Sequence, residues 1–273
     1  MIIAVALAAG ALIGLSLGAL GGGGSVLAVP VLVYGLGQSA TQATTGSLVV
    51  VGITSLAGAI TAYRSGSALL TRGIVFGLVA IGGAAAGAKA SGLVSQPVLL
   101  AAFAALLLAV AAVMGARQLR SRRRPAGSRA ESHLAGPIIS LRPSFACQCP
   151  RALGVLATAT IVGLLTGFLG VGGGFLVVPA LVLALGLPMA YAAGTSLVVI
   201  TITSASALAV RAGAGTSPAW GLVAVLTAAA VLGGWAGARL TTRTDTSKLQ
   251  AAFTVLLLLV AGYTASRALP ALA

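Results

Sequence analysis

Long apolar runs restrict the fold of this chain more than any other feature, because stretches of 18 or more such residues recur along its whole length. Hydrophobic residues make up 59% of the 273, charged residues only 7%, and the mean hydropathy is +1.11. A soluble domain carries about 25% charged residues. At about 20 residues per crossing, the chain is long enough for roughly eight to ten membrane helices. We therefore predict an all-α polytopic membrane protein.

Two glycine runs interrupt these apolar stretches. The first is Gly21–Gly24, which opens into Ser25 and an apolar tail containing a proline. The second, Gly170-Val171-Gly172-Gly173-Gly174, lies 149 residues later and opens into a similar tail. Glycine in a helix interior costs roughly 1 kcal/mol relative to alanine, so such runs are expensive unless they are used. We expect each run to break a membrane helix and to leave backbone amides facing a polar cavity.

The glycine runs belong to an internal duplication. Residues 18–55 superpose on residues 167–204 without a gap and give 20 identities in 38 positions. The matches include the triplet Ile53-Thr54-Ser55 against Ile202-Thr203-Ser204. Duplicated membrane segments with glycine and proline interruptions at corresponding positions point to a transporter site at the interface of two repeats.

The duplication divides the chain into an N-terminal transmembrane repeat (1–116), a basic cytoplasmic linker (117–151) and a C-terminal transmembrane repeat (152–273). The linker holds 8 of the 16 basic residues, the usual topology signal beside apolar spans rather than a nucleic-acid surface. Five segments per repeat place 13 of the 16 basic residues in the cytoplasm, and four per repeat place 12 there. We favour five, about ten transmembrane segments in all, because an odd number inverts the second repeat.

Groups for catalysis or metal binding are scarce. Glu131 and Asp245 are the only carboxylates and His133 is the only histidine, all in basic loops. No paired acids and no nucleophile with a partnered base are present, so we expect no catalytic residue, no metal site, no cofactor and no enzyme activity. Cys147 and Cys149 are expected to be reduced thiols. Coupling to sodium would use carbonyls and hydroxyls, and coupling to protons would use the substrate's own proton.

The glycine runs and the hydroxyls near them are the candidate binding groups. A helix that begins after Gly24, like its counterpart after Gly173, offers unpaired N–H groups and the positive end of a helix dipole. Glycines also let an anion approach the backbone. The predicted substrate-binding residues are Gly22, Gly23, Gly24, Ser25, Thr45, Ser47, Gly172, Gly173, Gly174, Thr195 and Ser196. The alternative is structural: the glycines serve close helix packing, and the hydroxyls bond back to their own helices.

Residues at the expected span ends have a simpler interpretation. Four of them are basic, and we expect them to extend toward the lipid headgroups rather than to bind a ligand: Arg64, Lys89, Arg211 and Arg239. Trp220 and Trp235 lie near the two ends of one expected span, as in an interfacial aromatic belt.

At these motifs the sequence resembles the sulfite exporter TauE/SafE family, also called the toluenesulfonate uptake permease family. The resemblance rests on Gly21–Leu32 and Gly170–Leu181, with Ala193-Gly194-Thr195-Ser196-Leu197 and its weaker counterpart Thr45-Gly46-Ser47-Leu48. It implies an integral membrane transporter for small sulfur-containing anions such as sulfite, sulfoacetate or aryl sulfonates. The family includes exporters and importers, so the resemblance does not give a direction. This chain departs from the pattern where Gly174 replaces the hydroxyl of Ser25 and where Thr45-Gly46 reverses the order found in the second half.

Together these observations predict a secondary transporter in the cell (inner) membrane. Two inverted five-segment repeats would work by alternating access, holding a sulfur-containing anion near the bilayer midplane. A coupling ion, H⁺ or Na⁺, and a homo-oligomeric state are both compatible with the sequence. The alternatives are a non-transporting membrane assembly protein, in which the glycines only pack helices, and a passive anion channel.

Overall fold

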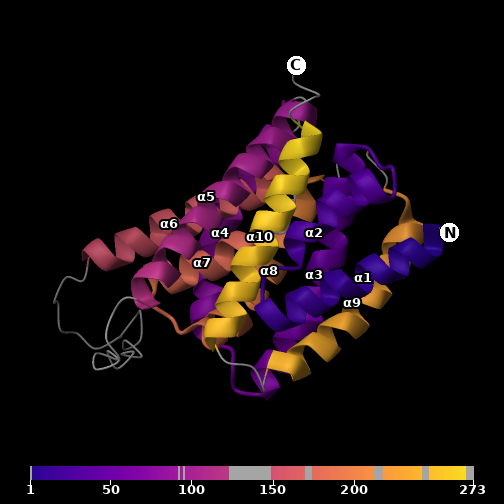
Figure 1. Ribbon diagram of the computed structural model, residues 1–273. Coiled ribbons are helices and arrows are strands. Elements are labelled where there is room, and N and C mark those ends of the chain that lie inside the picture. Colours follow the sequence, from indigo (N-terminus) through magenta and orange to yellow (C-terminus); the bar gives the residue numbers. More distant parts are fainter. Residues whose placement is uncertain are drawn as a thin grey trace.

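The computed structural model describes residues 2–91, 93–94, 96–122, 149–169, 174–211, 218–241 and 246–268, and every regular element in these ranges is a helix. In chain order the helices are α1 (Ile2–Leu20), α2 (Ser25–Pro30), the π-helix η1 (Val31–Gly35), α3 (Ala40–Arg64), α4 (Leu70–Ser91), α5 (Gln96–Arg122), α6 (Cys149–Leu169), α7 (Gly174–Ala184), α8 (Met189–Arg211), α9 (Trp220–Thr241) and α10 (Thr246–Ala268). The predicted all-α class is confirmed (Figure 1).

Five of these helices are long and apolar enough to cross a membrane: α1, α3, α4, α8 and α9. Their outer faces carry large apolar side chains, such as Leu232, which is 71% exposed, and Ile3, which is 62% exposed. Each would cost roughly 1.5–3 kcal/mol to leave in water, whereas lipid tails solvate them without penalty. The prediction of a polytopic membrane protein is therefore confirmed at this level.

The two short elements after the glycine runs do not reach across a bilayer. The continuous piece Ser25–Gly35 and the helix α7 each have 11 residues. That corresponds to about 16 Å at 1.5 Å per residue, against a hydrocarbon core of about 30 Å. Pro30 lacks an N–H and lies where α2 passes into the wider π-helical turn of η1. Both elements are therefore half-length helices that follow the glycine runs.

Glycine seams join helices from opposite halves of the chain. Helix α1 packs along α9, and α6 packs along α4. A Cβ at Gly14 would lie 2.6 Å from the carbonyl carbon of Ala230, and a Cβ at Gly163 would lie 2.9 Å from that of Ala80. A side chain would not fit at either position, so these glycines allow the two helix backbones to pack closely, as in small-xxx-small motifs. The first helix of each half therefore packs against the fourth helix of the other.

At the centre of the bundle, α3 crosses α8 in the opposite chain direction. A Cβ at Gly52 would lie 3.3 Å from Cβ of Ser204, and a Cβ at Gly58 would lie 3.0 Å from Cδ1 of Leu197. The residue numbers in contact decrease along α8 as they increase along α3, so the two helices are antiparallel. Helices α5 and α10 form a further pair that lies side by side at one face (Figure 1).

Equivalent positions in the two halves share backbone geometry. Gly37 and Gly186, separated by the same 149 residues as the glycine runs, both have φ of +66°. The residue after each glycine donates the same hydrogen bond, from Gln38 N to Leu32 O at 3.0 Å and from Leu187 N to Leu181 O at 3.3 Å. The similarity found in the sequence therefore extends to the turns that connect each short element to its following long helix.

Candidate functional site

The first glycine run ends α1 as the sequence predicts. Gly21 has φ of +73°, a conformation that side chains with a Cβ rarely adopt. Its N–H still donates to Leu17 O at 2.9 Å, and the chain then turns so that Ser25 N donates to Gly22 O at 3.3 Å. All of residues 21–25 are buried. The break therefore lies inside the protein rather than in a surface loop.

The two breaks approach each other within the bundle. A Cβ added at Gly174 would lie 3.0 Å from Gly22 Cα and 2.8 Å from Ser25 Oγ. On the other side, Gly21 lies so close to Ala193 of α8 that an added Cβ would be 2.6 Å from the alanine Cβ. Gly21 and Gly22 thus allow close packing against the second half, and Gly24 allows close packing against α1, where an added Cβ would lie 2.7 Å from Leu17 Cβ. This packing is part of what the structural alternative predicted. Gly172 and Gly173 lie outside the described residues.

Several amides at the first break are not used in its backbone hydrogen bonds. Within the described residues, the bonds formed there use the N–H groups of Gly21, Ser25 and Leu27 as donors, and the carbonyl oxygens of Leu17, Gly22 and Gly24 as acceptors. The N–H groups of Gly22, Gly23 and Gly24 donate none of these bonds. Among the four glycines of this run, Gly23 leaves the most room for a side chain. A Cβ there would meet only side chains, 3.0 Å from Leu20 Cδ1 and 3.2 Å from Leu256 Cδ2.

The candidate hydroxyls are engaged with protein carbonyls. Ser25 Oγ donates to Gly22 O at 2.7 Å, Thr45 Oγ1 to Thr41 O at 3.0 Å, and Ser47 Oγ to Thr44 O at 2.9 Å. Ser196 Oγ donates to Ala193 O at 2.7 Å and lies 3.0 Å from Gly21 O, across the contact between the halves.

Thr195 is different, because its Oγ1 accepts a hydrogen bond from Leu69 N at 3.0 Å. This bond fastens the segment between α3 and α4 onto the first turns of α8, a helix of the other half. The hydroxyls that we predicted to bind substrate are therefore distributed over separate contacts, and in this conformation they bond to backbone groups of the protein.

Three buried side chains whose polar atoms have no hydrogen-bond partner among the described residues were not predicted as site residues. Ser55 Oγ and Ser204 Oγ occupy equivalent positions on α3 and α8, and neither has a hydrogen-bond partner in the described part of the chain. Gln38, at the turn that leads into α3, is only 8% exposed, and neither polar atom of its side-chain amide meets a partner within the described ranges. Buried polar atoms without partners are uncommon and call for an explanation. The duplicated Ile-Thr-Ser triplets were the available sequence signal for the two serines.

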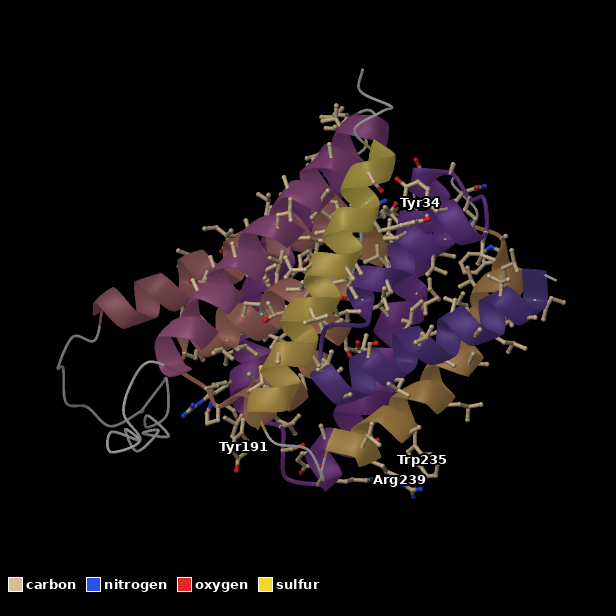
Figure 2. All side chains as sticks on the ribbon, viewed as in Figure 1. Tyr34, Tyr191, Trp235 and Arg239 are labelled. Atoms are coloured by element: carbon tan, nitrogen blue, oxygen red, sulfur yellow. The ribbon has the colours of Figure 1, made fainter. Side chains whose placement is uncertain are left out.

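Arg211 differs from the other basic residues at span ends. Arg64, Lys89 and Arg239 are exposed, as expected, and Arg239 stacks its guanidinium 3.6 Å from the Trp235 ring centroid (Figure 2). Arg211, the last residue of α8, is only 8% exposed. The expectation that it extends toward lipid headgroups is wrong, because its side chain turns inward onto three other helices. Nothing in the sequence around Arg211 distinguished it from the exposed basic residues.

Other ionisable groups contribute little to this region. The structure describes neither Glu131, His133 nor Asp245, so the part it does describe contains no carboxylate or histidine side chain. No group of three metal-binding side chains occurs within that part either. The chemistry available around the breaks is therefore that of amides, hydroxyls, carbonyls and one guanidinium.

Comparison with known proteins agrees with this architecture. The family model described as "Sulfite exporter TauE/SafE" matches residues 6–264. Two proteins of Xylella fastidiosa, from strains Temecula1 and 9a5c, are each named "Probable membrane transporter protein"; each is 34% identical over 193 residues, which cover 70% of this chain and 67% of the relative. No solved structure matches the chain. A match over nearly the whole length, on a membrane-spanning helical bundle, leads to one conclusion: the chain is a membrane transporter of the sulfite exporter TauE/SafE family.

Proposed function

We propose that this protein is a secondary transporter in the cell (inner) membrane that carries small sulfur-containing anions such as sulfite or organosulfonates. The observation that carries the proposal is the meeting of the two glycine breaks, where Gly22 lies against Gly174 inside the bundle. Amides at the first break that donate no backbone hydrogen bond among the described residues suit an anion, since glycine lets a ligand reach the backbone. The family name supports sulfite as the first anion to test.

Alternating access by a bundle built from two inverted five-segment repeats is the mechanism that we infer. Equivalent helices α3 and α8 cross antiparallel, and this is how two copies of one unit pack when the second is inverted. The predicted site residues Gly22, Gly23, Gly24 and Ser25 would bind the anion together with Thr45, Ser47, Gly172, Gly173, Gly174, Thr195 and Ser196. Four of the hydroxyls, those of Ser25, Thr45, Ser47 and Ser196, would exchange a carbonyl acceptor for an anion oxygen on binding. Coupling to Na⁺ or H⁺ completes the proposal, since secondary transport needs an ion gradient.

Uptake of ³⁵S-sulfite into proteoliposomes tests the substrate and the site together. We expect saturable uptake by the wild-type protein and at least a roughly 10-fold loss in Gly23→Leu, because the added side chain covers amides that would otherwise donate to the anion. Gly82→Leu is the matched control: it lies on an exposed face of α4, where a Cβ meets nothing within 4 Å. Equal uptake by the two variants would remove the amide site, and flux that does not saturate would indicate a passive channel instead.

The inverted arrangement makes a separate prediction about sidedness. Ser39 precedes α3 and its equivalent Pro188 precedes α8, so the two positions should face opposite sides of the membrane. Tyr34 and Tyr191, close to these positions in the chain, lie at opposite ends of the molecule (Figure 2). In a chain without Cys147 and Cys149, we expect an impermeant maleimide to label only one of Ser39→Cys and Pro188→Cys in intact cells. Labelling of both from the same side would contradict the inversion.

A further inference from the structure

The guanidinium of Arg211 joins the two halves of the bundle. Nη1 donates to Thr44 Oγ1 at 2.8 Å, and Nη2 donates to Ser91 Oγ at 2.7 Å and to Gly167 O at 3.2 Å. Thr44 and Ser91 belong to α3 and α4 of the first half, whereas Gly167 lies near the end of α6 in the second. The side chain therefore fills the space where three helix ends meet.

The charge on this guanidinium has no counter-ion in the described residues. All three acceptors are neutral oxygens, and the part of the chain that the structure describes holds no aspartate or glutamate. Burying a cation without a partner of opposite charge is expensive, and neutral hydrogen bonds offset only part of the cost. The Nε–H group is buried and has no hydrogen-bond partner among the residues that the structure describes. Both the charge and this donor would be satisfied by an anion.

The position of Arg211 relates it to the second glycine run. Gly167, whose carbonyl it contacts, precedes Gly170 by three residues in the chain. The register-equivalent of Arg211 in the first half is Ala62, whose carbonyl instead accepts from Ser67 N at 2.9 Å. The nearest arginine there is Arg64, which is exposed. Only one of the two equivalent helix ends, that of α8, therefore carries a buried cation. The corresponding end of α3 forms without one, so the fold of the repeat does not itself require a buried arginine there.

We propose that Arg211 is an anion-recognition residue of the transporter, binding an oxyanion through its Nε–H and a terminal N–H. Binding would give Nε–H a partner and would replace one bond of a terminal N–H, such as that of Nη2 to Ser91 Oγ, so that two charge-assisted bonds reach two oxygens of the anion. The planar fork of arginine fits two oxygens of a sulfite, sulfonate or similar group, and such bonds are about twice as strong as neutral ones. This inference rests on the proposed anion transport, and it assigns the recognition of charge to a side chain, in addition to the amides.

Anion-dependent thermal stabilisation of the purified protein in detergent tests the proposal, with sodium sulfite compared against sodium chloride at equal ionic strength. We expect sulfite to stabilise the wild type, and we expect Arg211→Gln to weaken the apparent affinity for sulfite about 10- to 100-fold. Arg211→Lys should show an intermediate loss, since it retains the charge without the fork. Arg64→Gln, the matched control at the exposed span end, should bind as the wild type does.

A purely structural role gives a different result. Arg211→Gln would then lower the melting temperature equally with and without sulfite and leave the apparent affinity unchanged, which overturns the proposal. Thr44→Val removes one neutral acceptor but keeps the charge, so it should lower stability while sulfite still stabilises it. Stabilisation of the wild type by phosphatidylglycerol, with no competition from sulfite, would assign the guanidinium to a lipid phosphate and would also overturn the proposal.

Transport in proteoliposomes separates this inference from the proposed function. If the wild type accumulates ³⁵S-sulfite and Arg211→Gln does so with the same KM, the role of Arg211 fails while sulfite transport stands. If the wild type moves no sulfite, yet sulfite stabilises it and not Arg211→Gln, the anion site stands while the proposed transport of sulfite fails. An increase in KM of at least 10-fold in Arg211→Gln, with Arg64→Gln within 2-fold of the wild type, supports both.

Discussion

Gly14→Ala is expected to destabilise the protein by about 3 kcal/mol, although the same change usually stabilises a helix by up to about 1 kcal/mol. The added methyl would lie 2.6 Å from the carbonyl carbon of Ala230 and 2.8 Å from its Cα, so α1 and α9 would have to separate. Backbone atoms cannot move aside as the end of a flexible side chain can. The measurement is reversible unfolding in mixed micelles, followed by circular dichroism.

Gly262→Ala provides the control for this measurement. Gly262 lies on an exposed face of α10, and a Cβ there meets nothing within 4 Å. We expect it to be neutral or slightly stabilising, since alanine is the better helix former. Gly163→Ala, in the equivalent seam between α6 and α4, should reproduce the loss seen for Gly14→Ala. A neutral result in either seam would show that the helices can separate there at little cost.

The second large effect is expected for Gly21→Ala at the first break. Its φ of +73° costs an alanine roughly 1–2 kcal/mol, and the methyl would also lie 2.6 Å from Ala193 Cβ, which adds about 1–3 kcal/mol. Displacing this residue would also disturb the contact from Ser196 Oγ to Gly21 O, at 3.0 Å. We expect losses both in the free energy of unfolding and in the maximal rate of sulfite uptake.

Gly37→Ala separates the two causes. Gly37 has φ of +66°, but a Cβ there meets nothing within 4 Å, so only the conformational cost of roughly 1–2 kcal/mol applies. The difference between the two variants in unfolding experiments measures the close approach of the two halves. Equal losses would mean that the contact with Ala193 contributes nothing to stability.

The class of the protein and its helix breaks could be predicted from the sequence because both depend on local properties. A run of apolar residues is sufficient to indicate a membrane helix. Four near-consecutive glycines are sufficient to end one, and α1 does end at Leu20, immediately before Gly21. The duplication was visible because identical residues recur at a fixed spacing.

The burial and the hydrogen-bond partners of individual polar side chains could not be predicted, because both depend on which helices meet. Arg211 and Arg64 both end long spans, yet Arg211 is 8% exposed and Arg64 is exposed. The difference arises from the helix ends supplied by α4 and α6, far away in the chain. In the same way, Thr195 Oγ1 accepts a hydrogen bond from Leu69 N only because the segment before α4 folds onto α8. No local pattern encodes such contacts.

The crosswise glycine seams have a mechanical consequence. Helix α1 packs along α9, and α6 packs along α4. Movement of one half of the chain relative to the other would therefore separate both of these close-packed helix pairs. Any rigid part that moves must therefore take helices from both halves, such as α1 with α9 or α6 with α4. The boundary between moving parts would therefore not coincide with the boundary between the duplicated halves. A half expressed as a separate chain would leave two glycine-lined helix faces uncovered.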